Sequence, residues 1–202
     1  MTDTNIKRYT VPEIFLKKNK SKIVSLSCYT SQIAKIVDKY VDIILVGDSM
    51  GMVIYGQKNT LSVTKQMMIE HGKAVVNCTK RALVVIDLPF GTYEGSKKKA
   101  FDISAEILSK TGANAVKLEG GIELADTISF LVERGIPVMG HIGLMPQKIN
   151  VKGKFISQGH SSLEVKKIAS TSINLFRILN LYLEPVIPET SERIKNYLQS
   201  ND

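Results

Sequence analysis

A parallel α/β fold of repeated strand–helix units is predicted by the way two patterns alternate along the chain. The first pattern is a short, continuous run rich in Val, Ile and Leu, which is typical of strands buried on both faces of a parallel sheet. The second is an amphipathic segment with apolar residues at helical spacing. Six runs fit the strand pattern, at residues 23–29, 43–48, 83–89, 115–120, 137–143 and 181–186.

The segments between these runs have the features of helices. The clearest places Ala100, Ile103 and Ile107 on one face, and Gly112 follows as a C-terminal stop. The other helices are predicted over residues 31–40, 64–79, 124–132 and 190–198. Thr190 is a suitable N-cap for the last of them.

Repeated units of this kind form either a doubly wound sheet or a (β/α)8 barrel. A closed barrel needs eight strands and typically about 250 residues, whereas this chain has 202 residues and six predicted strands. No linker or low-complexity stretch divides it. We therefore expect one domain over residues 1–202 that ends before its architecture is complete.

Composition excludes several classes of protein. No apolar run reaches the roughly 18 residues that a membrane span needs, and the polar N-terminus lacks the apolar core of a secretory signal. The two cysteines, Cys28 and Cys78, are too few for a disulfide scaffold or a cysteine-based zinc site. A reducing, cytoplasmic location is expected.

The chain is basic, with 27 Lys and Arg against 19 Asp and Glu. Its densest basic runs, at residues 17–22 and 96–99, lack the interleaved aromatic residues of a nucleic-acid-binding surface. We interpret them as solvated lysine faces and expect no nucleic-acid partner. A basic surface also helps to attract an anionic substrate.

Polar residues stand near the C-terminal ends of five predicted strands. They are Asp48, Asp87, Glu119, His141 and Glu184. The strand ends of parallel α/β folds meet at one edge, where active sites are built. A carboxylate in an apolar strand is costly to bury unless it is paired or binds a cation. Three carboxylates at equivalent strand ends are enough to indicate an oxygen-ligand site for Mg2+ or a similar ion.

Each of these residues also has a structural interpretation. Asp48 could cap the following helix, and Lys117 and Glu119, which alternate on one strand and point to the same side, could form a buried ion pair. His141 alone is typical of a hydrogen-bonded core histidine. The glycine-rich stretches match neither a full phosphate-binding loop nor a dinucleotide fingerprint.

Four motifs in a fixed order give the chain a family resemblance. They are Leu-Val-Gly-Asp-Ser-Met-Gly-Met at 45–52, Asp-Leu-Pro-Phe at 87–90, Val-Lys-Leu-Glu-Gly-Gly at 116–121 and Gly-His-Ile-Gly-Leu-Met-Pro-Gln at 140–147. With them the chain resembles the ketopantoate hydroxymethyltransferases over roughly residues 8 to 160.

The resemblance implies a TIM barrel, here with about six βα units present and the last two missing, and an Mg2+-dependent homo-oligomeric enzyme. Such an enzyme moves a hydroxymethyl group from 5,10-methylenetetrahydrofolate to 3-methyl-2-oxobutanoate and gives 2-dehydropantoate, in pantothenate biosynthesis. By match of motif, Asp48 and Asp87 are the metal ligands, with Glu119 at the metal or one water away. Asp48, Ser49, Asp87, Lys117 and His141 are the substrate-binding residues.

The resemblance also assigns the catalytic base to Glu184, within Leu-Glu-Pro-Val-Ile-Pro at residues 183–188. Two features depart from the family pattern: residues 173–182 lack a small-residue turn, and Thr30 stands where the family usually has Asp. Two alternatives to an active transferase remain. In the first, the chain is an inactive truncated remnant or a subunit completed by another chain. In the second, it is another Mg2+-dependent keto-acid carbon–carbon lyase of the same barrel superfamily.

Overall fold

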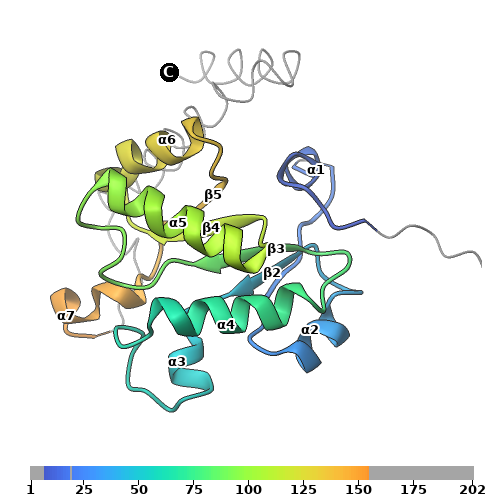
Figure 1. Cartoon of the computed structure of the whole chain (residues 1–202), viewed down its shortest axis with the longest axis horizontal. Coiled ribbons are helices and arrows are strands. Elements are labelled where there is room, and N and C mark those ends of the chain that lie inside the picture. The colour runs from blue at the N-terminus through green and yellow to red at the C-terminus, as the bar shows by residue number, and fades with distance from the viewer. Residues whose placement is uncertain (1–6, 19, 155–202) are drawn as a thin grey trace, which may run out of the picture. The chain divides into compact units, whose positions relative to one another are not determined.

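The computed structural model describes residues 7–18 and 20–154, and its strands form one five-stranded sheet (Figure 1). The strands are β1 Ser25–Ser27, β2 Ile43–Val46, β3 Leu83–Asp87, β4 Ala115–Glu119 and β5 Val138–His141. Five of the six predicted runs are therefore confirmed as strands. The sixth run, at 181–186, and the helix predicted over 190–198 lie outside the described residues.

The strand order is that of a barrel. The sheet runs β1-β2-β3-β4-β5 without a reversal, whereas a doubly wound sheet reverses its order at a switch point. Parallel register pairs Ser25 with Ile43, and Ile43 with Leu83. Of the two parallel α/β architectures that the sequence allows, this order selects the barrel type.

The described residues group into two compact units. Unit 1 holds the described residues up to Leu118 together with Ile136–Met139, and unit 2 holds Glu119–Gly135 and the described residues from Gly140 on. The helices of unit 1 are α1 Val11–Leu16, α2 Ser31–Val37, α3 Met50–Val53, α4 Lys65–Val76 and α5 Lys97–Thr111. Those of unit 2 are η1 Ile122–Leu124, α6 Ala125–Glu133, η2 Pro146–Lys148 and α7 Ile149–Lys152.

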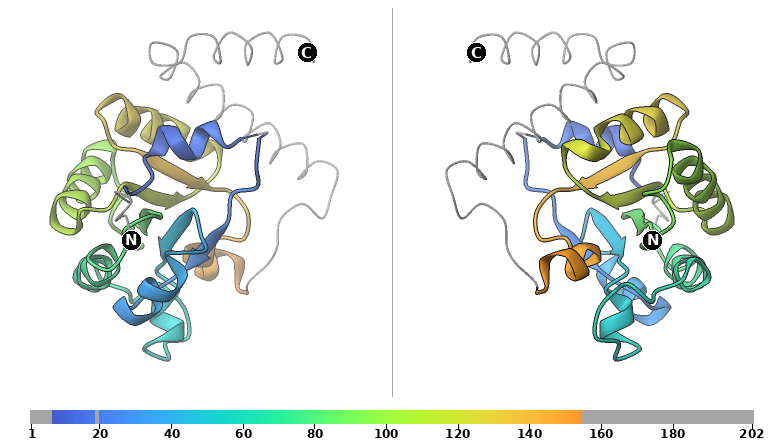
Figure 2. Two further views of the ribbon diagram at one scale, coloured as in Figure 1. Left: turned by 90° about the vertical axis from the view of Figure 1, so that its right-hand side faces the viewer. Right: turned by 90° about the vertical axis from the view of Figure 1, so that its left-hand side faces the viewer.

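In unit 1, α4 and α5 pack against each other, and α4 also contacts β2 and β3 (Figures 1 and 2). Their starts follow from local sequence, because the side chains of Thr64 and Ser96 accept the backbone N–H groups of the first turns of α4 and α5. Gly112 ends α5 with a φ of 71°, the left-handed conformation that glycine tolerates best, which confirms the predicted stop.

Helix α1 covers the N-terminal ends of the central strands. It begins with a capping box in which Thr10 and Glu13 satisfy each other's backbone N–H groups, and it carries Ile14 into the core. Ile14 packs with the first residues of three strands, Ile43, Leu83 and Ala115. This short helix is absent from the sequence-based expectation.

A buried acidic residue, Asp42, joins α1 to the strands at this end. Its carboxylate lies 2.7 Å from Lys17 Nζ, 3.4 Å from Arg81 Nη2 and 3.0 Å from the backbone nitrogen of Val24. Burial alone would raise the pKa of Asp42, but the hydrogen bonds from Lys17 and Val24 and the positive charges of Lys17 and Arg81 hold this pKa below its ordinary value.

Among the helices of the described residues, none has both the length and the apolar character that a membrane span requires.

This network makes the fold sensitive to acid. Because the pKa of Asp42 is lower in the folded than in the unfolded protein, its stabilisation is complete above about pH 4 and is lost as the pH falls through the folded value. Asp42→Asn should lower the free energy of unfolding at pH 7 by about 2 kcal/mol and flatten its dependence on pH below about 5.

Urea unfolding at several pH values between about 3 and 7 measures both effects. Glu70→Gln is the control, since Glu70 pairs with Lys73 at the surface and its loss should change stability by less than about 0.5 kcal/mol. An Asp42→Asn variant with the acid sensitivity of the wild type would contradict this account.

Candidate functional site

A buried polar cluster lies at the C-terminal ends of β2, β3 and β4 in unit 1. Asp87 is the last residue of β3, Asp48 follows β2 by two residues, and Lys117 is the register partner of Asp87 on β4. Lys117 Nζ lies 2.7 Å from Asp87 Oδ1, and the backbone N–H of Asp48 donates to Asp87 Oδ2 at 3.2 Å. The structure thus brings these three predicted site residues together.

The burial of these groups sets the electrostatics of the cluster. Asp48, Asp87 and Lys117 are only 2%, 4% and 9% exposed. Ionised groups are this buried only when they are compensated, and Lys117 and Asp87 compensate each other as an ion pair. The three side chains together carry one formal negative charge, so the cluster suits a cationic ligand.

Gly47 lets Ser49 join this cluster. A methyl group added at Gly47 would lie 2.9 Å from Ser49 Oγ and 3.3 Å from Asp87 Oδ2, so the hydroxyl and the carboxylate converge on one point above the glycine. Ser49 occupies the N-cap position of α3 without a side-chain capping bond, and its hydroxyl lies 2.9 Å from Tyr29 Oη instead. The capping interpretation of Asp48 is therefore wrong, because the N-cap of α3 is Ser49. The structural interpretation of Lys117 paired it with Glu119, whereas in the structure Lys117 pairs with Asp87.

Unit 2 holds a second polar cluster, at the ends of β4 and β5. Glu119 Oε2 accepts the backbone N–H of Gln147 at 3.0 Å, and Glu119 Oε1 lies 3.4 Å from His141 Nδ1. The two groups are close but are not joined by a hydrogen bond, and Nδ1 has no hydrogen-bond partner among the described residues. Glu119 and His141 are the last residues of their strands, and a backbone bond from Gly120 to His141 joins those strand ends.

Gln147 is a contact that the sequence reasoning did not anticipate. Gln147 lies in the first turn of η2, where backbone N–H groups have no partner within the helix, and its N–H donates to Glu119 instead. Lys148 of η2 binds Glu123 of η1, and this hydrogen bond, against an opposing effect of burial, lowers the pKa of Glu123 to about 2. Only the proline in the motif at 140–147 signals the turn in advance.

Asp48 and Asp87 are candidate ligands for a hard cation such as Mg2+. In the described part of the chain, no group of three or more His, Cys, Asp and Glu side chains is arranged to hold a metal ion. Mg2+ commonly binds through one or two carboxylates, with the remaining positions filled by substrate and water. Asp48 and Asp87 supply buried hard oxygen donors of that kind. The roles of Asp48, Ser49, Asp87, Lys117, Glu119 and His141 all stay predictions, and Glu184 lies outside the described residues.

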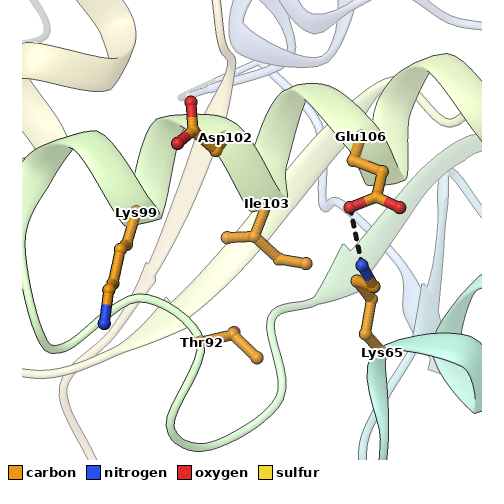
Figure 3. Close-up of a pocket in the computed structure, with 6 residues that line it drawn as sticks. All are labelled: Lys65, Thr92, Lys99, Asp102, Ile103 and Glu106. Atoms are coloured by element: carbon orange, nitrogen blue, oxygen red, sulfur yellow. Dashed lines mark hydrogen bonds and ion pairs between the residues drawn. The ribbon is translucent and has the colours of Figure 1, made fainter.

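A surface pocket of about 340 Å³ lies elsewhere in unit 1, against α4 and α5 (Figure 3). It is lined by Lys65, Thr92, Lys99, Asp102, Ile103 and Glu106. The pair Lys65–Glu106, with a 2.9 Å separation, spans it from α4 to α5. Among the described residues of unit 1, none of the predicted site residues lines this pocket, so it is separate from the cluster of Asp48, Asp87 and Lys117.

Comparison with known proteins gives the same family as the motifs. The family described as ketopantoate hydroxymethyltransferase matches residues 8–200. A 3-methyl-2-oxobutanoate hydroxymethyltransferase of Agrobacterium fabrum is 45% identical over 194 residues, which are 93% of this chain and 70% of the relative. The enzyme of that name from Rhizobium etli is 53% identical over 162 residues, covering 80% of this chain and 59% of the relative. The chain therefore spans only about six to seven tenths of these relatives.

Two solved structures resemble the fold. A phosphonopyruvate hydrolase, in complex with oxalate and Mg2+, aligns with a TM-score of 0.55 and 11% identity over 72% of this chain and 55% of its own. A 2,3-dimethylmalate lyase of the PEP mutase/isocitrate lyase superfamily aligns with a TM-score of 0.54 and 14% identity, over 77% and 64% of the two chains. At these identities the likeness concerns the fold alone, which is of the TIM-barrel type.

The buried ion pair leads to a prediction about stability. Lys117→Met leaves the carboxylate of Asp87 buried without its cation and should lower the free energy of unfolding by about 3–5 kcal/mol. The double variant Asp87→Asn/Lys117→Met removes both charges and should lose clearly less. Urea unfolding of the two single variants and the double variant measures the coupling. Losses that simply add would contradict the pairing.

The close contact at Gly47 leads to a second prediction about stability. Gly47→Ala should displace Ser49 Oγ or Asp87 Oδ2 and destabilise the fold by about 1–3 kcal/mol. Gly95→Ala is the matched control, because the nearest atom to its added methyl group is 3.6 Å away and its cost should be under about 0.5 kcal/mol. Equal stability of the two variants, measured in urea, would show that Gly47 has more room than its contacts indicate.

Proposed function

The chain belongs to the ketopantoate hydroxymethyltransferase family, and from this premise we propose that the whole protein transfers a hydroxymethyl group from 5,10-methylenetetrahydrofolate to 3-methyl-2-oxobutanoate. The product is 2-dehydropantoate, an intermediate of pantothenate biosynthesis. The observation that carries the proposal is the buried cluster of Asp48, Asp87 and Lys117 with Ser49 beside it.

The chemistry requires positive charge beside the keto oxygen. Forming a carbon–carbon bond next to a ketone begins with loss of a weakly acidic proton, and negative charge then develops on the oxygen. Lys117 supplies a fixed ammonium group in a site that is nearly closed to solvent, where charge acts more strongly than in water. Its bond to Asp87 fixes the position of the ammonium group before substrate binds.

The donors of the cluster suit an anionic keto acid. The carboxylate and keto oxygens of the substrate are acceptors, and the Ser49 hydroxyl and Lys117 ammonium are donors. Asp48 and Asp87 would hold Mg2+, which, when bound, acts as a Lewis acid toward the keto oxygen. Glu119 is proposed at the metal or one water away, His141 near the substrate, and Glu184 as the base that removes the proton.

The alternatives differ in what supports them. A keto-acid lyase of the same superfamily is favoured only by likeness of fold at 11–14% identity, whereas relatives at 45–53% identity carry the transferase name. Cys28 and Cys78 are free thiols, which supports a cytoplasmic location. Assembly into a homo-oligomer, a single barrel domain and completion by another chain stay predictions.

An assay with defined substrates tests the proposed function. Purified protein should convert 3-methyl-2-oxobutanoate and 5,10-methylenetetrahydrofolate to 2-dehydropantoate with Mg2+ and lose this activity with EDTA. Asp48→Asn should weaken Mg2+-dependent binding of the keto acid at least about 10-fold in calorimetry, because it removes one negative charge from the proposed ligand pair. Glu94→Gln, at a loop position outside the cluster, is the control and should leave that binding unchanged.

Binding is measured separately from turnover, so a defect in either step is visible. Binding of the keto acid that is equally strong in EDTA, or unchanged in Asp48→Asn, would refute the metal site. The lack of both binding and product formation in the wild-type chain would refute the transferase assignment for this chain.

A further inference from the structure

Tyr29 is a part of unit 1 that the proposed chemistry leaves without a role. It follows β1, and its hydroxyl lies 2.9 Å from the hydroxyl of Ser49. The side chain of Tyr29 is only partly exposed. It therefore reaches the cluster from a strand that contributes none of the predicted site residues.

The chemistry of the two hydroxyls fixes the direction of their hydrogen bond when substrate is present. A serine hydroxyl has one hydrogen to donate, and the oxygens of a keto acid only accept. If Ser49 donates its hydrogen to the substrate, the bond between the two residues must be donated by Tyr29. Tyr29 then aims the Ser49 hydrogen, because the donated bond restricts rotation of the hydroxyl group.

Tyr29 is itself held by His71 of α4. His71 Nδ1 lies 2.6 Å from the carbonyl oxygen of Tyr29, and since a carbonyl only accepts, Nδ1 carries the hydrogen. In the neutral ring Nε2 is then an acceptor, and Tyr55 Oη, at 2.9 Å, donates to it. The rings of Tyr55 and His71 also meet edge to face, with centroids 5.8 Å apart.

We propose that Tyr29 is a positioning residue for substrate binding: its hydroxyl orients Ser49 toward the keto acid, and His71 holds the strand end that carries Tyr29. This inference rests on the proposed function, which supplies the keto acid. It adds a residue from the loop after β1, and one from α4, to the cluster of Asp48, Ser49, Asp87 and Lys117.

A double-variant cycle tests the proposal. In calorimetry with Mg2+, Tyr29→Phe should raise the Kd for 3-methyl-2-oxobutanoate about 3- to 10-fold, the range expected for one lost hydrogen bond. Ser49→Ala should raise the Kd by at least as much. The double variant should bind as Ser49→Ala does, within about twofold, because Tyr29 acts through Ser49. Tyr40→Phe, at a side chain that is 74% exposed, is the matched control and should bind as the wild type does.

A second pair of variants keeps the test decisive if Tyr29→Phe does not fold. His71→Asn keeps an N–H donor near the Tyr29 carbonyl, whereas His71→Leu does not. His71→Leu should therefore weaken binding more than His71→Asn, and this difference should vanish in a Ser49→Ala background. Urea unfolding of each variant shows whether it is folded.

The outcomes separate the two proposals. If the wild type binds the keto acid but Tyr29→Phe has no effect, or its effect persists at full size without Ser49, the positioning role is refuted and the transferase function stands. Wild-type protein that does not bind the keto acid with Mg2+ would refute the proposed function and, with it, this inference.

Discussion

The ion pair between Lys117 and Asp87 is the interaction on which the candidate site depends. Both groups lie on neighbouring strands, in register and nearly out of contact with water. Burial of either charge alone would cost several kcal/mol, so each charge offsets the cost of burying the other. The pairing also occupies only one oxygen of Asp87, and the second accepts the N–H of Asp48. The loop after β2 is thereby tied to the strand that carries the carboxylate.

The two ends of the strands serve different purposes. At the N-terminal end, α1 inserts Ile14 among the first residues of the strands, and Asp42 satisfies the groups around it. At the C-terminal ends of the strands in unit 1, buried charged groups lie around Gly47, where a larger side chain would not fit. Barrels commonly separate stability from function in this way. In this chain the separation follows from which polar residues interrupt the apolar runs, and at which end.

Sequence patterns predicted the strands well because a continuous apolar run has few alternatives in a parallel sheet. They also placed Asp48 and Asp87 near one edge, since strand ends of a parallel sheet coincide. Lys117 entered the site only through the family resemblance, and its pairing with Asp87 was not predicted. Contacts that depend on packing between distant segments were missed. His71 reaches Tyr29 across 42 positions of the chain, and neither residue has a local pattern that marks the contact. Helix α1 was missed because its six residues are too few to show a periodic pattern.

Thr30, which departs from the family pattern, has a contact in the structure that explains how this residue is accommodated. The resemblance to the family leads us to expect Asp at this position, and in this chain the Thr30 side chain accepts the backbone N–H of Ile33 as the N-cap of α2. Threonine and aspartate oxygens both serve in this way, so the exchange keeps the start of the helix. The charge that Asp would carry is not needed for capping. By contrast, the charges and the hydroxyl group of four residues in unit 1 are not used to cap a helix. These residues are Asp48, Ser49, Asp87 and Lys117. Thr30 therefore contributes to local structure as a helix cap, whereas the roles proposed for Asp48, Asp87 and Lys117 depend on charge.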